Sequence, residues 1–247
     1  MRITVAIPTY NEAENLPGLV SALFALPLDL HLVVVDDNSP DGTGRLAGEL
    51  AEAWPGRIRV ICRAEKLGLC SAYLEAFRVA LDEGAEAIAQ MDADFSHDPA
   101  SLPQMAERLQ TCDVVFGSRY VEGGAVDKRW PLWRKALSAW GNFYARTILG
   151  MPLHDVTTGY RLWRAEALRQ MPLERVGARG YVFMVEMAYL AYCLGYRIAE
   201  VPIYFTERRW GKSKMSLQIQ LEAALRVWQV RWQYRDLRQK QATTVRR

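Results

Sequence analysis

Short apolar runs alternate with helix-like intervals through the first half of the chain, and this pattern constrains the fold more than any other feature. The runs are Ile3–Ile7, Leu30–Val35, Arg57–Ile61, Ala87–Met91 and Asp113–Gly117. Two of the intervals carry apolar residues at helical spacing: Leu16, Leu19, Val20 and Leu23 in one, Tyr73, Ala76, Phe77 and Ala80 in the other. Strands that alternate with helices form a mostly parallel sheet with helices on its faces. The sequence therefore predicts an α/β fold, in which ligands bind beyond the carboxyl ends of the strands.

The second half of the chain predicts further helices and one more strand. A helix is expected to begin at Trp130 and Pro131, with an apolar stripe made of Trp133, Leu137, Trp140, Tyr144 and Ile148. Beyond it we expect a polar loop at Asp155–Gly159, a helix at Phe183–Leu194, a strand at Ile198–Phe205 and a basic loop at Arg208–Lys214. The 247 residues, half of them hydrophobic and without an internal repeat, suit one large α/β unit with a C-terminal extension.

The C-terminal segment, residues 215–247, is basic and amphipathic. It holds seven lysines and arginines against two acidic residues, whereas the rest of the chain is slightly acidic. A helix beginning near Met215 would place Leu217, Leu221, Leu225, Trp228 and Trp232 in one stripe, with Arg226, Arg231, Arg235 and Arg238 as cations beside it. This pattern is typical of a helix that lies on an anionic surface, either lipid or nucleic acid. The alternatives are that the stripe packs against the body of the protein, or that the basic end is simply solvated.

The cysteines and the absence of long apolar runs bear on the setting of the protein. Cys62, Cys70, Cys112 and Cys193 show no C-x-x-C spacing, which argues against a disulfide framework and against a zinc site. The opening run is too short for a signal peptide, and Glu186 interrupts the most apolar stretch of the second half. We therefore expect a reducing, cytoplasmic setting and no membrane-spanning segment.

The pair Asp92 and Asp94 is the strongest chemical feature. Both carboxylates follow the run Ala87–Met91 directly, so a turn at the end of that strand would let them converge. Carboxylate oxygens suit Mg²⁺ or Mn²⁺ bound to a substrate diphosphate, where the metal stabilises a leaving group. The D-x-D pattern is common by itself, and its place at a strand end is what favours a functional role.

Two other strand-end loops add polar groups to the same edge of the sheet. Asp36 and Asp37 follow Leu30–Val35, and Asp37 could accept hydrogen bonds from a nucleobase or ribose. Helix capping by Asp41 or Thr43 is the structural alternative in that loop. Tyr10, after the first run, could stack on a base. The chain has neither a G-x-G-x-x-G pattern nor a P-loop, which weakens dehydrogenase and ATPase interpretations.

Four motifs occur in register: Ile7–Glu12, Val35–Asp41, Met91–His97 and Gly117–Tyr120. Together they make the chain resemble the dolichol-phosphate mannose synthases of glycosyltransferase family 2. The likeness continues through Trp130 and Pro131, Arg134 and Lys135, Thr158–Arg161 and Arg208–Lys214, so that it covers nearly the whole chain. Some of these relatives continue into transmembrane helices, whereas this chain resembles the form without them.

The resemblance implies the GT-A nucleotide-sugar transferase fold with added amphipathic interface helices, and mannose transfer from GDP-mannose to a polyprenyl or dolichyl phosphate. The residues implied for the donor are Pro8, Tyr10, Glu12, Val35, Asp37, Asp92, Ala93, Asp94, Arg208 and Lys214. Those implied for the acceptor phosphate are Arg119, Arg134 and Ser138. Asp92, Asp94 and Ser96 would hold Mg²⁺ or Mn²⁺, although the position of Ser96 is Gln in some relatives. Asp92, Asp94 and Arg119 would be the catalytic residues.

The same resemblance suggests a division of the chain and a location. Residues 1–214 would form the catalytic domain, with a donor half at 1–120 and an acceptor half at 121–214, and residues 215–247 would follow as a basic amphipathic helix and tail. The protein would act on the cytoplasmic face of a membrane and would not bind nucleic acid. Two other functions stay open: transfer of glucose from UDP-glucose to a polyprenyl phosphate, and nucleotide-sugar binding at a membrane without catalysis.

Overall fold

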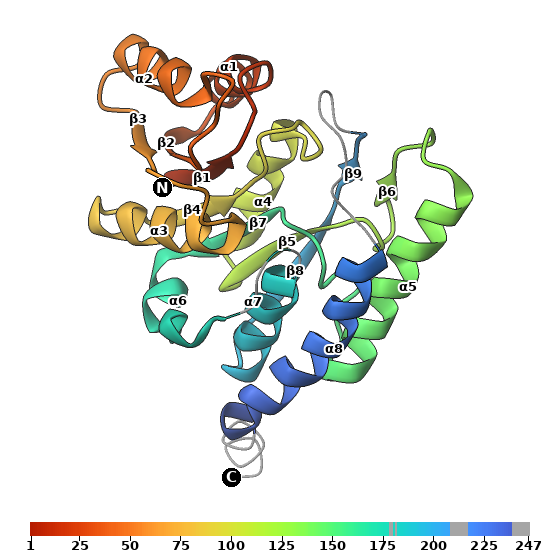
Figure 1. Ribbon diagram of the computed structural model, residues 1–247. Helices are drawn as coiled ribbons and strands as arrows, with labels where there is room; N and C mark the ends of the chain where they lie inside the picture. The colour runs from red at the N-terminus through yellow and green to blue at the C-terminus, as the bar shows by residue number, and fades with distance from the viewer. Residues whose placement is uncertain (178–179, 181, 208–216, 239–247) are drawn as a thin grey trace.

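The computed structural model describes residues 1–247 except 178–179, 181, 208–216 and 239–247 (Figure 1). A central sheet of seven strands runs through it in the order β3-β2-β1-β4-β7-β5-β8. The strands are β1 (Arg2–Thr9), β2 (Asp29–Asp36), β3 (Ile58–Cys62), β4 (Ala87–Gln90), β5 (Val114–Ser118), β7 (Arg161–Arg164) and β8 (Ile198–Pro202). Only β7 is antiparallel to its neighbours, β4 and β5. The mostly parallel sheet predicted from the sequence is confirmed.

Helices cover both faces of this sheet. The α-helices are α1 (Leu16–Phe24), α2 (Thr43–Ala53), α3 (Leu69–Asp82), α4 (Leu102–Leu109), α5 (Leu132–Leu149), α6 (Ala165–Gln170), α7 (Val182–Cys193) and α8 (Leu217–Gln233), with short 3-10 turns at Pro99–Ser101 and Leu173–Arg175. One apolar core joins the sheet to α1, α2 and α4, and the other joins it to α3, α5, α6, α7 and α8. The sheet is thus buried on both faces, as its continuous apolar strands require.

Three local expectations from the sequence need correction. The strand expected over Ile198–Phe205 is two strands, because β8 pairs with β5 while β9 (Tyr204–Phe205) pairs with β6 (Ala125–Val126) in a separate small sheet. β7 was not predicted, since it begins and ends with arginine. Thr43 does not cap α2; it is the first residue of that helix, and its hydroxyl accepts the backbone N–H of Glu12 over 3.0 Å.

α8 packs along α5 and α7 (Figure 1). Val227, Val230 and Tyr234 lie in the core, and the Tyr234 hydroxyl donates to the buried Glu186 carboxylate over 2.9 Å. The predicted apolar stripe faces the other way, since Leu225, Trp228 and Trp232 are exposed. Its remaining members, Leu217 and Leu221, have side chains outside the described part. The alternative in which the stripe packs on the body is therefore wrong for the members that the structure describes. Among the described residues, no helix is long and apolar enough to cross a membrane.

Candidate active site

The loops after β1, β2 and β4 meet at the carboxyl edge of the sheet. Each holds one non-glycine residue with a left-handed backbone: Asn11 at φ 61°, Asn38 at φ 58° and Phe95 at φ 60°. Such a conformation costs energy for a side chain as bulky as Phe95, and it persists only where the surrounding contacts fix it. Residues of this kind cluster at functional sites, and these three mark the edge where the sequence predicts the donor site.

The two aspartates at the end of β2 have different roles. Asp36 accepts the hydroxyls of Thr9 and Ser39, at 3.0 and 2.5 Å, and so ties β1 to the loop after β2. Asp37 holds a different loop: its Oδ1 accepts the Leu67 N–H at 2.9 Å, and its Oδ2 accepts the Gly68 N–H at 2.7 Å. Arg63 pairs with Asp37 over 3.1 Å. Asp37 thus fixes the loop of residues 63–68 through its hydrogen bonds and its ion pair.

The other predicted base-pocket residues lie on β1, on β2 and in the loop after β1. Pro8 on β1 lies opposite Val35 on β2 in the strand register, and Val35 is fully buried. The Lys66 ammonium lies 3.2 Å from the ring centroid of Tyr10, a cation–π contact. The carboxylate of Glu12 accepts the side-chain amide of Asn15 over 2.7 Å.

Asp92 and Asp94 follow β4 in the turn that the sequence required. Asp94 is buried and its Oδ1 accepts the Ser96 N–H over 3.0 Å. Among the described residues, no group of three or more His, Cys, Asp or Glu side chains could hold a metal ion. Two carboxylates are enough for a Mg²⁺ or Mn²⁺ site in which water and substrate phosphates supply the other ligands. Ser96 supports Asp94 through its backbone. Ala93, between the two carboxylates, is buried.

His97 binds the backbone of the same turn. The ring is buried, stacks on Tyr160 at 5.2 Å and accepts the Asp92 N–H at Nδ1 over 3.2 Å. Burial lowers the pKa of His97, although the charges of Asp92 and Asp94 act in the opposite direction. The ring is therefore neutral at neutral pH, which leaves Nδ1 able to accept this hydrogen bond.

Arg119, after β5, is held by Asp155 in a buried ion pair. Its Nε and Nη2 lie 2.7 and 2.8 Å from the two carboxylate oxygens, and Nη2 also donates to the Thr157 hydroxyl over 2.7 Å. Burial alone raises the pKa of Asp155, but the charge and hydrogen bonds of Arg119 outweigh it and hold the pKa below its ordinary value. The same pair raises the pKa of Arg119 despite burial, so the arginine stays charged.

Arg134 and Ser138 lie one turn apart on α5, as predicted. The Ser138 hydroxyl is 2.9 Å from the hydroxyl of Tyr120, the residue after Arg119. Arg134 stacks on Trp130 with its guanidinium carbon 3.8 Å from the ring centroid, and it pairs with Glu207 over 2.8 Å. Arg208 and Lys214 lie outside the described residues.

Phe205 connects the aspartate turn to both arginines. Its ring meets His97 edge-on at 5.5 Å and Trp130 at 5.6 Å, while the Arg119 guanidinium carbon lies 5.3 Å from its centroid. Because Arg134 stacks on Trp130, both predicted acceptor arginines and the turn with Asp92 share one set of contacts. The structure therefore joins two groups of residues that are far apart in the sequence.

Several residues of the site escaped the sequence analysis. Asp155, Tyr73 and His97 each contact a predicted site residue, but none carried a role in the sequence interpretation. Arg161 is another: it is fully buried on β7 and donates from Nη2 to the carbonyls of Val156 and Met184, at 3.1 and 2.6 Å. Burial lowers its pKa to about 9. Its bond to Val156 fixes the loop on which Asp155 sits. Three sequence signals pointed here without giving these residues a role: the polar loop at Asp155–Gly159, the stretch Thr158–Arg161 and the motif Met91–His97.

The architecture and the paired carboxylates at a strand end define the GT-A class of nucleotide-sugar transferases. Among solved structures, glucosyl-3-phosphoglycerate synthase from Mycobacterium tuberculosis in complex with Mn²⁺, uridine diphosphate and glucosyl-3-phosphoglycerate is similar, with a TM-score of 0.61 and 17% sequence identity over 93% of this chain and 78% of that one. This level of identity supports the shared fold.

The family follows from the sequence comparisons. Residues 4–171 match the model of glycosyl transferase family 2, and the chain belongs to that family. It is a glycosyltransferase. The polyprenol monophosphomannose synthase of Mycolicibacterium smegmatis is 45% identical, over 93% of this chain and 88% of its own length. The undecaprenyl-phosphate mannosyltransferase of Micrococcus luteus is 44% identical, over 94% of each chain. The resemblance drawn from the four motifs is confirmed.

Proposed function

We propose that the protein transfers mannose from GDP-mannose to a polyprenyl phosphate of the dolichyl type, with inversion at the sugar, on the cytoplasmic face of a membrane. The observation that supports this proposal is the contact set around Phe205, whose ring meets Arg119, Trp130 with its stacked Arg134, and His97 in the turn of Asp92. Two cations linked in this way to a carboxylate pair suit a reaction between two phosphate-bearing substrates. The names of the two relatives agree with a mannosyl donor and a polyprenyl phosphate acceptor.

The donor half would bind the nucleotide through the strand-end loops. Tyr10 offers a ring for the base, Pro8 and Val35 shape the floor, and Asp37 with Glu12 supplies carboxylate acceptors. Arg208 and Lys214 would meet the phosphates. Ala93 lies between the two carboxylates and would let the diphosphate approach the backbone of the turn.

Asp92 and Asp94 would hold Mg²⁺ or Mn²⁺, with Ser96 supporting Asp94. Such an ion, when bound, offsets the negative charge of the departing diphosphate. No general base is needed, because the acceptor phosphate is already an anion. One of its oxygens attacks the anomeric carbon, the bond from that carbon to the diphosphate oxygen breaks, and the electron pair leaves with GDP. Arg119 and Arg134 would hold the attacking phosphate in line against the repulsion of the donor.

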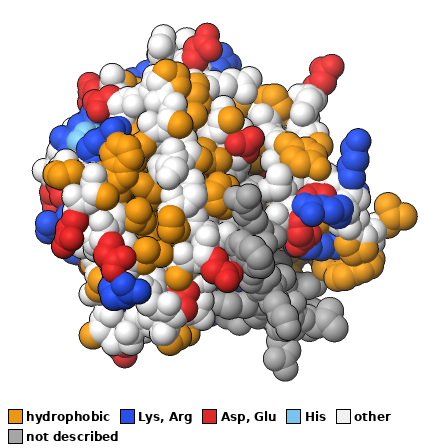
Figure 2. Space-filling view, turned by 90° about the horizontal axis from the view of Figure 1, so that it is seen from above, with side chains coloured by type: hydrophobic (Ala, Val, Ile, Leu, Met, Phe, Trp, Pro, Cys, Tyr) orange, Lys and Arg blue, Asp and Glu red, His pale blue; other side chains and the backbone are white. Residues whose placement is uncertain are grey.

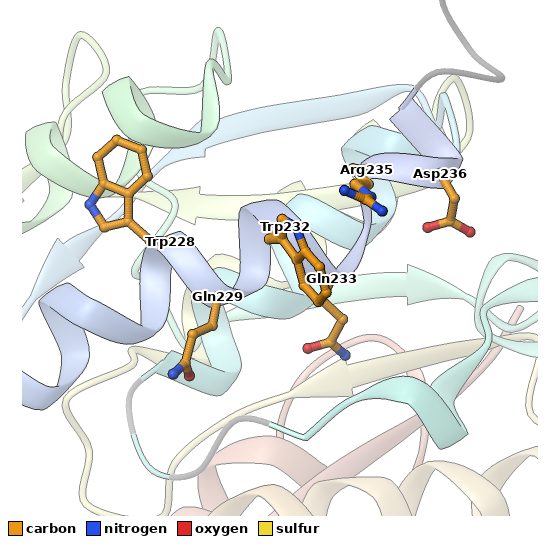
Figure 3. A pocket seen from close by; sticks show the side chains of 6 residues that line it. All are labelled: Trp228, Gln229, Trp232, Gln233, Arg235 and Asp236. Atoms are coloured by element: carbon orange, nitrogen blue, oxygen red, sulfur yellow. The ribbon is translucent and has the colours of Figure 1, made fainter.

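The acceptor is a lipid, and one side of the molecule suits a membrane surface. Large apolar side chains are exposed on α5 and α8: Leu132, Trp133, Trp140, Phe143, Leu225, Trp228 and Trp232. Seen from above, hydrophobic and basic side chains lie together on the side where α5 runs (Figure 2). Trp228 and Trp232 project from successive turns of α8 and line a surface hollow with Arg235 (Figure 3). Exposed tryptophans flanked by arginines are typical of membrane interfaces.

One assay tests the proposal. The protein is incubated with Mn²⁺ or Mg²⁺, a polyprenyl phosphate and either labelled GDP-mannose or labelled UDP-glucose, and the lipid extract is counted. We expect label from GDP-mannose, in a product with β configuration at the sugar. Label from UDP-glucose alone would make the protein a glucosyltransferase, and an α-linked product would overturn the single displacement. No label with either donor would contradict the proposed transfer and favour the alternative of a non-catalytic nucleotide-sugar-binding module.

A further inference from the structure

Asp92 is held at two points by Tyr73 and His97, neither of which received a role in the sequence analysis. The Tyr73 hydroxyl donates to Oδ1 over 2.8 Å, and the Asp92 N–H donates to His97 Nδ1 over 3.2 Å. A carboxylate can only accept, so the direction of the Tyr73 bond is fixed. It leaves Oδ2 as the oxygen without a hydrogen-bond partner in the described part of the chain.

Tyr73 is itself rigid. Its side chain is fully buried on α3, and its ring lies against Phe77 and Phe183, with both centroids 5.9 Å away. The hydroxyl is therefore a fixed donor that reaches the carboxyl edge of β4 from the helix beneath the sheet. A bare aspartate side chain, by contrast, has a broad preference for its last torsion and can exchange its two oxygens.

Gly159 lies next to Oδ2 of Asp92, and its lack of a side chain leaves space there. A Cβ atom at Gly159 would lie 3.7 Å from Asp92 Oδ2 and 3.2 Å from the His97 ring. The second distance is tighter than most real Cβ contacts, so a side chain here would press on the histidine that anchors the turn. Gly159, Tyr73 and His97 thus surround Asp92 on three sides.

We propose that Tyr73 is a positioning residue that fixes the rotamer of Asp92, so that Oδ2 faces the divalent cation and donor diphosphate while His97 holds the backbone of the same residue. This inference rests on the proposed function, because it assumes a metal-bound nucleotide at Asp92. Outer contacts that orient a metal ligand commonly change metal affinity by about 10- to 100-fold when they are removed.

The test compares two variants that each delete one buried tyrosine hydroxyl bonded to a carboxylate. Tyr73→Phe removes the bond to Asp92, and Tyr234→Phe removes the 2.9 Å bond to Glu186, which lies between α8 and α7. Mn²⁺ affinity is measured from the electron paramagnetic resonance signal of free Mn²⁺, with saturating GDP and separately with UDP. We expect about 10-fold weaker Mn²⁺ binding for Tyr73→Phe and no change for Tyr234→Phe.

A second pair of variants separates positioning from general loosening of the fold. In an Asp92→Ala background, adding Tyr73→Phe should change Mn²⁺ affinity by less than about two-fold, since the side chain that the hydroxyl orients is gone. Wild-type Mn²⁺ affinity in Tyr73→Phe, or an equal loss in both backgrounds, would overturn the proposal. Because this readout needs no sugar transfer, it stands apart from the assay of the proposed function: absence of transfer would refute that function and leave the Mn²⁺ comparison intact.

Discussion

Asp155 binds Arg119 through both carboxylate oxygens and also accepts its backbone N–H over 3.1 Å. These contacts, with the bond to Thr157, use Nε and Nη2 and leave Nη1 without a hydrogen-bond partner among the described residues. The guanidinium is therefore charged and held in one orientation by Asp155, and in the proposed function Nη1 would meet the acceptor phosphate. The protein contains a surface copy of this arrangement, because Asp113 binds Arg197 through the same three atoms at 2.8 to 3.2 Å.

This copy provides the control for a first prediction. Asp155→Asn should raise the KM for polyprenyl phosphate more than about ten-fold, because an amide turns donors toward Arg119 and frees the guanidinium to move. GDP affinity should stay within about two-fold. Asp113→Asn should leave both quantities unchanged. Steady-state kinetics and calorimetry measure them; an unchanged KM in Asp155→Asn would show that Arg119 needs no such support.

The same two variants predict a pH dependence of stability. The pKa of Asp155 is lower in the folded state than the ordinary value of about 3.9. Its contribution is therefore complete above about pH 4 and is lost as the pH falls through the folded pKa. Breaking a buried pair costs about 3–5 kcal/mol. The difference in unfolding free energy between wild type and Asp155→Asn should have this size at pH 7 and shrink below pH 4.

Urea titrations at pH 7, 5, 4 and 3 measure this difference. Asp113→Asn should differ from wild type by about 1 kcal/mol or less at every pH, because its partner Arg197 is largely exposed and surface pairs contribute little. A wild-type advantage over Asp155→Asn that does not shrink at all between pH 5 and pH 3 would contradict the assignment of the effect to the carboxylate charge.

The five strands of the first half were predictable because buried parallel strands consist of unbroken apolar residues. β7 was not predicted, because Arg161 and Arg164 interrupt its apolar pattern. The backbone carbonyls that allow Arg161 to be buried meet it only in the folded chain. The site shows the same limit. Strand ends located Asp92 and Asp37, but Asp155 lies 36 residues from Arg119 and Tyr73 lies 19 from Asp92. Local patterns carry no information on such pairings.

Asp94 is predicted to be essential for transfer. Asp94→Ala should lower kcat by at least about 100-fold while the protein stays folded, because the departing diphosphate would lose the charge compensation of a bound cation. Asp98→Ala is the control in the segment after that turn, since Asp98 is exposed and caps the 3-10 turn at Pro99–Ser101 by accepting the Ala100 N–H over 2.9 Å. Transfer rates with Mn²⁺ measure kcat, and circular dichroism shows whether the variant is folded. Near-normal turnover in Asp94→Ala would contradict a role for the metal in the mechanism.

Arg134 is predicted to act on the acceptor and not on the membrane. Arg134→Ala should raise the KM for polyprenyl phosphate by about ten-fold or more, through loss of a charge-assisted contact, and leave vesicle binding unchanged. Arg129→Ala is the control, because Arg129 is exposed and pairs with Asp127 on the loop before α5. Kinetics and vesicle sedimentation separate the two effects. Equal KM values in the two variants would place the acceptor phosphate elsewhere.

The last prediction concerns the membrane face. Deleting α8 is not an informative test, because Val227, Val230 and Tyr234 belong to the core. Exchanging the exposed tryptophans of α8 is an informative test, because it leaves the core residues in place. The double variant Trp228→Ser and Trp232→Ser should bind anionic phospholipid vesicles about ten-fold or more weakly, because two indoles leave the interface, while GDP affinity and the thermal midpoint stay the same.

Trp54→Ser is the matched control for that double variant, because Trp54 is partly exposed at the end of α2, on the other side of the molecule from α8 (Figure 1). It should bind vesicles like the wild type. Sedimentation with vesicles containing phosphatidylserine, compared with neutral vesicles, gives the affinity and its dependence on charge. If the double variant binds as tightly as Trp54→Ser, α8 is not the contact. Trp133→Ser with Trp140→Ser then becomes the decisive pair, since those indoles are similarly exposed and lie on α5, the helix that carries Arg134.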